Sequence, residues 1–130
     1  MTTPLHCAVS KGHINAVRVL LEWGAKDSNT YGHYKWTALH IASDLGYIDI
    51  AELLIDVTPN IDMCSLCGST PLHLAVRNGQ ASIVDLLIKI KADTNTMDIC
   101  GRTPLDDALR RKQHYLDDDT IVSLLSHQAN

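Results

Sequence analysis

The sequence predicts an all-α repeat solenoid, a stack of helix-turn-helix units joined by β-hairpin-like loops. Three observations lead to this fold class: a threonine-led motif that recurs along the chain, a glycine at a fixed distance after the first three copies, and apolar pairs that follow each glycine. One pair of short helices cannot cover its own apolar faces. Neighbouring units must therefore stack into one continuous core.

The recurring motif marks the start of each unit. It opens at Thr3, Thr37, Thr70 and Thr103, so the starts lie 34, 33 and 33 residues apart. A threonine side chain can cap a helix, and the proline that follows it in three of the four copies suits a first helical turn. We therefore expect a short helix to begin directly after each threonine.

The glycines mark the end of these first helices. Gly12, Gly46 and Gly79 each lie nine residues after the opening threonine. Glycine adopts the positive φ that ends a helix and lets the chain reverse into a second one. Apolar residues then recur at helical spacing. The predicted core residues that join adjacent units are Leu20, Leu54, Leu87, Ala8, Ala42 and Ala75.

With the motifs Thr3-Pro4-Leu5-His6, Thr37-Ala38-Leu39-His40 and Thr70-Pro71-Leu72-His73, the chain resembles the ankyrin-repeat family over about residues 3–126. We expect residues 1–130 to form a single domain, with repeats at about 3–36, 37–69 and 70–102 and a C-terminal cap at 103–126. The resemblance implies that His6, His40 and His73 are structural hydrogen-bonding residues. They lie a full repeat apart, which is too far for ligands that share one metal ion.

The two end units depart from the pattern in different ways. The fourth has Asp106 in place of the histidine and Lys112 in place of the turn glycine, and its polar residues suit a terminal cap. The first opens at Thr3, and part of its apolar second helix is expected to face water. Upstream repeats of a longer array, a partner or a second copy of the chain could cover that surface.

Composition narrows the class of function. A formal net charge of −4 argues against a nucleic-acid partner, and the apolar stretches are shorter than the about 20 residues of a membrane span. The sequence has no glycine-rich nucleotide loop, no His-Glu-x-x-His and no Gly-x-Ser-x-Gly, so we expect neither an enzyme nor a cofactor. A start without a basic-then-apolar leader, together with reduced cysteines, predicts a cytoplasmic or nuclear protein.

The cysteines are the one weak candidate for chemistry. Cys64 and Cys67 have the spacing of metal ligands, and Cys100 occupies the repeat position of Cys67. A zinc site needs a fourth ligand and convergence of all four. A thiol or metal site at Cys64, Cys67 and Cys100 is therefore the third hypothesis, after protein binding and a purely structural role.

The resemblance also implies where a partner would dock. In ankyrin proteins this is the concave side, formed by the loop tips between repeats and by late positions of the first helices. The predicted partner-binding residues are Tyr31, His33, Tyr34, Trp36, Asp44, Leu66, Arg77, Ile99, Arg102, Arg110 and Arg111. The arginines favour an acidic partner segment. A structural alternative for Trp36 is that it packs down to hold the first loop.

One modification site follows from the resemblance alone. Asn95 lies at the repeat position where ankyrin proteins are sometimes hydroxylated by an asparaginyl hydroxylase, with Leu87 eight residues before it. The alternative is that Asn95 serves only the local turn.

The sequence thus predicts a non-catalytic protein-protein interaction module that acts as an adaptor, inhibitor or scaffold. The rival prediction is a structural fragment or isoform of a longer ankyrin-repeat array, without an independent partner.

Overall fold

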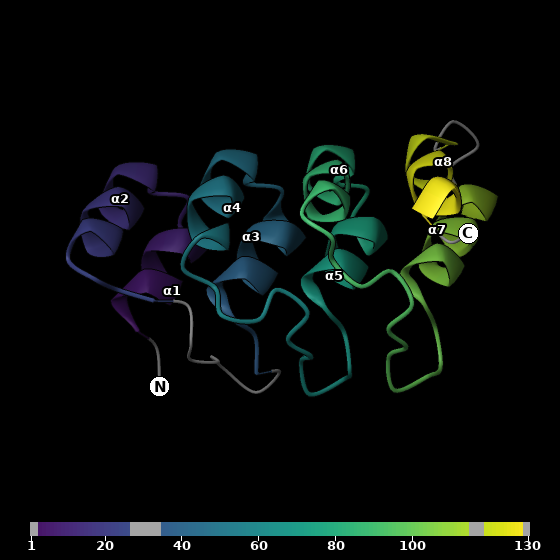
Figure 1. The fold of residues 1–130 in the computed structure, drawn as a ribbon, viewed down its shortest axis with the longest axis horizontal. Coiled ribbons are helices and arrows are strands. Elements are labelled where there is room, and N and C mark those ends of the chain that lie inside the picture. Colours follow the sequence, from purple (N-terminus) through teal and green to yellow (C-terminus); the bar gives the residue numbers. More distant parts are fainter. Residues whose placement is uncertain (1–2, 27–34, 115–118, 129–130) are drawn as a thin grey trace.

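A computed structural model describes residues 3–26, 35–114 and 119–128, and in these ranges the chain forms eight helices. The helices come in four pairs. They are α1 (Pro4–Ser10) with α2 (Ile14–Glu22), α3 (Ala38–Leu45) with α4 (Ile48–Ile55), α5 (Pro71–Arg77) with α6 (Ala81–Lys89), and α7 (Pro104–His114) with α8 (Asp119–Gln128). The pairs stand side by side along the long axis, and the two loops that join the second, third and fourth pairs lie along one edge of the stack (Figure 1).

The opening threonines cap the first helices as the motif predicts. The side chains of Thr3, Thr37 and Thr70 each accept a hydrogen bond from a backbone amide in the first turn. In the second and third pairs the histidine at the same turn completes a capping box through Nδ1. Each cap satisfies amides that the helix itself leaves without partners.

The fourth pair uses a different residue for the same cap. Asp106 stands where the other pairs have histidine, its amide donates to Thr103 Oγ1, and its Oδ2 accepts from the amide of Thr103 at 2.9 Å. The carboxylate therefore replaces the imidazole as the acceptor of the capping box.

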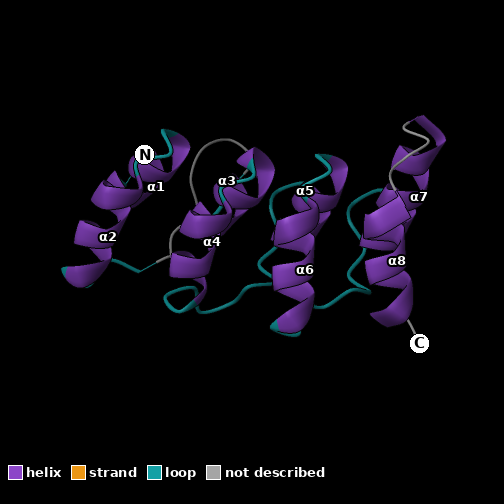
Figure 2. Cartoon of the chain, turned by 90° about the horizontal axis from the view of Figure 1, so that it is seen from above, coloured by secondary structure: helices purple, strands orange, loops and turns teal. Residues whose placement is uncertain are grey.

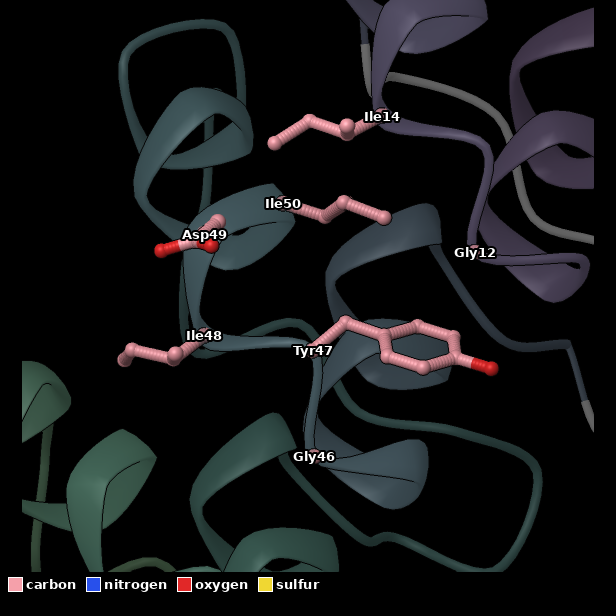
Figure 3. A pocket seen from close by; sticks show the side chains of 7 residues that line it. All are labelled: Gly12, Ile14, Gly46, Tyr47, Ile48, Asp49 and Ile50. Carbon is pink, nitrogen blue, oxygen red and sulfur yellow. The ribbon is translucent and has the colours of Figure 1, made fainter.

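The turn glycines have a second role beyond their positive φ values of 69° to 82°. Each lies beneath a side chain of the next repeat: the Tyr47 ring lies beside Gly12, Gln80 beside Gly46 and Arg111 beside Gly79. Figure 3 shows the tyrosine ring reaching from the start of α4 toward Gly12. A side chain at any of these glycines would occupy the space that its neighbour uses.

The core runs through the stack between pairs. First helices pack on first helices, from α1 through α3 and α5 to α7, and second helices pack likewise from α2 through α4 and α6 to α8. Seen from above, the four helix pairs lie side by side and roughly parallel to one another (Figure 2). Leu54, Leu87, Ala42 and Ala75 are completely buried and Ala8 is nearly so, which confirms five of the six predicted core residues.

Leu20 is the exception among the predicted core residues. It is only partly buried, although its counterparts Leu54 and Leu87 are completely buried. The prediction was wrong for Leu20 because no described helix pair lies against that face of α1 and α2.

A left-handed residue ends the third pair. Gly24 ends the first pair with φ of 90°, and Lys91 takes the corresponding place in the third pair with φ of 72°. A residue with a side chain is strained in this left-handed conformation. Lys91 nevertheless adopts it, so the third pair ends with the same backbone geometry as the first pair, without a glycine.

Candidate protein-binding surface

The loops between the second, third and fourth pairs end in two turns of the same geometry. In the turn 65–68, the amide of Gly68 donates to Ser65 O at 2.9 Å, and the amide of Ser65 donates to Ser69 O at 2.9 Å. In the turn 98–101, Gly101 and Asp98 repeat both bonds, each again at 2.9 Å. We call these turns the second tip and the third tip.

The central positions of the tips present apolar side chains to solvent. Leu66 in the second tip is 60% exposed, Ile99 in the third tip is 76% exposed, and Met97 beside it is 62% exposed. We call these three residues the apolar tip strip. Cys64, Cys67 and Cys100 are exposed in the same loops. Single exposed apolar residues are ordinary, but three in adjoining tips mark a candidate contact surface.

The two tips are held together by their backbones. The amide of Ile99 donates to Cys67 O at 2.9 Å. Gly68 permits this approach, because a Cβ at that position would lie 2.9 Å from the Ile99 nitrogen. A second link joins the loops further back, where the amide of Asp93 donates to Asp62 Oδ1 at 2.9 Å. The apolar tip strip is therefore carried on a braced support, which reduces the entropy lost on binding.

The loop between the first and second helix pairs, which we call the first tip, is described only at its ends. Tyr31, His33 and Tyr34 lie outside the described residues. Trp36 is partly buried, packs against the core, and its ring stacks on the His40 ring with centroids 6.4 Å apart. This placement agrees with the structural alternative for Trp36.

Arg77, the last residue of α5, lies at the centre of a polar network. Its Nη2 donates to Asp98 Oδ2 at 2.5 Å, its Nε to Asp107 Oδ2 at 3.0 Å and its Nη1 to Ser69 Oγ at 2.7 Å. Its carbonyl oxygen accepts from Arg111 Nη1 at 3.1 Å. One guanidinium thus joins the start of its own helix, the third tip and the first turn of α7.

This network changes the charge expected at the C-terminal end of the stack, which we call the far end and which carries Arg77, Arg102, Arg110 and Arg111. The side chains of Asp98 and Asp107 are almost fully shielded, and their two negative charges more than offset the single positive charge of Arg77. Arg102 is partly buried, Arg110 is exposed, and Arg111 is partly buried over Gly79. The far end is therefore less basic than the count of four arginines suggests.

Hydrogen bonds fix the ionisation of Asp98. Burial raises the pKa of this carboxyl, but the backbone amides of Arg102 and Cys100, both 2.9 Å from Oδ1, and the Arg77 charge outweigh it, so the pKa lies below its ordinary value. Asp98 is charged at neutral pH, as the ion pair requires.

Asp44 at the end of α3 is in a different environment. It accepts a hydrogen bond from Asn78 Nδ2 at 2.7 Å, and Gln80 Nε2 donates to its carbonyl oxygen at 3.3 Å. Burial raises the pKa of this carboxyl, and the bond from Asn78 offsets only part of the effect. Asp44 thus links the second and third repeats, in addition to being a candidate contact residue.

Among the described residues, the side chains close enough to share a metal ion are His73, Asp98 and Asp107. The Arg77 guanidinium already bonds both carboxylates, and His73 Nε2 lies 2.9 Å from Arg102 O. The Arg77 guanidinium therefore supplies the positive charge that a metal ion would otherwise bring to these carboxylates. The four cysteines are free thiols, and none of them is in a metal-capable group of the described residues.

Asn95 is exposed on the loop before the third tip. Its backbone amide donates to Asp93 Oδ1 at 2.8 Å, which forms a local Asx turn.

In the part of the chain that the structure describes, no helix is long and apolar enough to cross a membrane.

Two hollows lie away from the tips. A cleft of about 270 Å³ runs between α2 and α4, where Ile14 and Ile50 face one another above Tyr47 (Figure 3). A wider, mostly apolar groove of about 590 Å³ lies on the open side of α1 and α2. The first hollow belongs to the contact between two repeats.

Four stacked helix pairs with threonine caps, the first three of them with turn glycines, define a repeat solenoid whose loops expose the second and third tips. The chain belongs to the ankyrin-repeat family, because the family described as "Ankyrin repeats (3 copies)" matches residues 1–65 and 56–130.

Curated relatives share part of the chain. It is 39% identical over 67 residues to protein phosphatase 1 regulatory subunit 27 of Mus musculus and of Homo sapiens, which is 52% of this chain and 43% of each relative. It is 43% identical over 54 residues to the transient receptor potential cation channel subfamily A member 1 of Homo sapiens, which is 42% of this chain and 5% of the channel. The chain therefore spans less than half the length of these relatives.

Proposed function

We propose that this protein is a non-catalytic adaptor, inhibitor or scaffold that binds a partner protein through the second and third tips. The observation that carries the proposal is the apolar tip strip: Leu66 and Ile99 are exposed on two mutually bonded turns, and Met97 is exposed beside the third tip. Burial of apolar surface is the dominant favourable term in most protein–protein association.

The expected partner presents an apolar surface rather than an acidic segment alone. Arg77, one of the four arginines of the far end, is already bonded to two carboxylates. Arg102 and Arg110 remain at the rim, where charges act mainly on the association rate. Apolar contact at the tips therefore provides the affinity, and the arginines orient the approach.

The test compares the set of proteins captured from lysate by the native chain with the sets captured by two variants. We expect Leu66→Ser combined with Ile99→Ser to lose specific partners that the native chain captures from lysate. The matched control is Trp23→Ser, since Trp23 is 84% exposed at the end of α2 and lies outside the apolar tip strip. Capture unchanged by the tip variant, with both variants folded, would contradict the proposal.

A second candidate function comes from similarity to a named relative. The stretch shared with protein phosphatase 1 regulatory subunit 27 covers 52% of this chain, so modulation of a protein phosphatase is the partner class to test first. Titration of the purified catalytic subunit of protein phosphatase 1 with this chain decides it. Saturable binding supports the candidate, and its absence at high micromolar concentration rejects it.

A further inference from the structure

The first helix pair presents an apolar groove to solvent, at the end of the stack remote from α7 and α8 (Figure 1). Small side chains from both helices line it, with Cys7 and Ala8 on α1 and Ala16 on α2. Val19 and Leu20 continue the lining along α2, and both are only partly covered or exposed. We call the groove lined by these five residues the N-terminal groove.

The apolar residues that α2 leaves in solvent share one face of the helix. At positions i, i+3, i+4 and i+7 they are Ala16, Val19, Leu20 and Trp23. Trp23 follows the last residue of α2 and is 84% exposed. Its counterpart in the second repeat, Val57, is partly buried and packs against the core. Because tryptophan is enriched among the residues that dominate interfaces, this stripe indicates a contact surface.

The charge at the N-terminal groove is positive. Lys11 and His13 belong to its lining, at the end where α1 turns into α2, and both are exposed. None of the residues that line the groove is acidic. Residues 3–26 carry three lysine or arginine side chains and one carboxylate, although the whole chain has a net charge of −4. The groove therefore suits an occupant that combines an apolar stripe with an acidic side chain near Lys11.

The groove also has the shape that a helix fills. Its lining comes from two packed helices, α1 and α2, and a third helix packs by inserting a ridge of side chains between such elements. Helices that bind in apolar grooves contact them through residues at i, i+3, i+4 and i+7. A flat membrane surface would contact Trp23 and Lys11 but would leave the groove between the helices unfilled.

A second copy of the chain does not bring the charge that this groove requires. Its own N-terminal groove carries the same Lys11 and His13, and the described part of its far end exposes Arg110. Placing either surface of a second copy on the groove would bring like charges together.

We propose that the N-terminal groove binds an amphipathic helix of a partner protein, which packs an apolar stripe along Ala16, Val19, Leu20 and Trp23 and places a carboxylate beside Lys11. This surface is different from the apolar tip strip, so the inference does not depend on the partner binding proposed for the tips.

The test uses two synthetic helical peptides of about 16 residues, since shorter isolated helices are marginally stable. Both have leucines at i, i+3, i+4 and i+7, and one carries two glutamates at one end where the other carries two lysines. Binding is followed by the emission of Trp23, which should shift to shorter wavelength as the ring leaves water. Trp36 is partly buried and gives a background, and Trp23→Phe identifies the part of the signal that comes from Trp23.

We expect the acidic peptide to bind the native chain about tenfold more tightly than the basic one, because attraction to Lys11 replaces repulsion. Lys11→Glu should reverse this preference. The matched control is Arg18→Glu, the same change of charge at an exposed residue of α2 that does not line the groove. It should leave the preference in place, and Leu66→Ser in the apolar tip strip should leave the affinity of the peptide unchanged.

A native chain whose Trp23 emission does not respond to the acidic peptide at millimolar concentration would overturn the proposal. So would a preference that Lys11→Glu leaves as it is. A Trp23 shift produced by phosphatidylserine vesicles in place of the peptide would assign the groove to a membrane surface. Native dimers in sedimentation that Ala16→Glu dissociates would assign it to a second copy, and either result would contradict the helix as its occupant.

Discussion

Arg77 and Asp98 form an ion pair, with Nη2 and Oδ2 2.5 Å apart, that joins the end of α5 to the third tip. The same guanidinium bonds Asp107 in the first turn of α7 at 3.0 Å. The third tip and the fourth repeat are therefore fixed by one side chain, and the proposed partner-binding surface is connected to the joint between the last two repeats.

Arg77→Ala should destabilise the fold by about 3 kcal/mol, because it leaves two shielded carboxylates without their counter-charge. The measurement is the free energy of unfolding in urea. The control is Lys89→Ala, which removes an exposed, solvent-screened pair with Asp85 and should leave the free energy of unfolding nearly unchanged. Equal effects of the two variants would show that the Arg77 network contributes little.

The ion pair also predicts a pH dependence. The pKa of Asp98 in the folded protein lies below the ordinary value of about 3.9 that it regains on unfolding. The unfolded chain then binds more protons in acid, so the contribution is complete above about pH 4 and is lost as the pH falls through the lowered pKa. The difference in unfolding free energy between the native chain and Asp98→Asn should shrink over that acidic range. A difference that stays constant from pH 6 to pH 2 would contradict the assignment.

The two tip glycines provide a matched pair. Gly68 and Gly101 have φ values of 75° and 77°, but a Cβ at Gly68 would lie 2.9 Å from the Ile99 nitrogen, whereas one at Gly101 would meet nothing within 4 Å. Gly101→Ala should cost about 1 to 2 kcal/mol through backbone strain alone. Gly68→Ala should cost more, because it also disturbs the backbone bond between the tips. Equal losses in melting experiments would mean that the tips do not depend on their contact.

Stacking between repeats is tested at Leu54. Leu54→Ala should cost about 2 to 5 kcal/mol, because the side chain is completely buried between helix pairs. Val19→Ala in the first repeat should cost well under half as much, since Val19 is 47% exposed. A loss below about 1 kcal/mol at Leu54 in denaturant melts would show that the stacking register is wrong.

Repetition explains why so much of the fold could be predicted from the sequence. The threonine caps and turn glycines act within a few residues, so Thr70 and Gly79 carry their structural roles in their own spacing. Leu20 shows the limit of this reasoning. Its pattern is the same as that of Leu54, but its burial depends on a neighbouring helix pair that the pattern alone does not supply.

The candidate site could be predicted only in part. The exposure of Leu66 and Ile99 agrees with their place at the tips. The network of Arg77 could not be foreseen, because Asp98 and Asp107 lie 21 and 30 residues further along the chain and their approach depends on the stacking of α5 on α7. The family resemblance placed Arg77 among the predicted partner-binding residues, and packing gives it a structural role as well.

The most direct test of the protein-binding account is the affinity of a purified partner for Leu66→Ala and Ile99→Ala, measured together with their unfolding free energies. Both side chains are largely exposed, so truncation removes contact area without opening a cavity. We expect the affinity for the partner to fall by about 2 kcal/mol, roughly thirtyfold, for the variant that removes the main anchor. The unfolding free energy should change by less than about 0.5 kcal/mol. Affinities equal to that of the native chain for both variants would contradict the claim that the tips bind the partner.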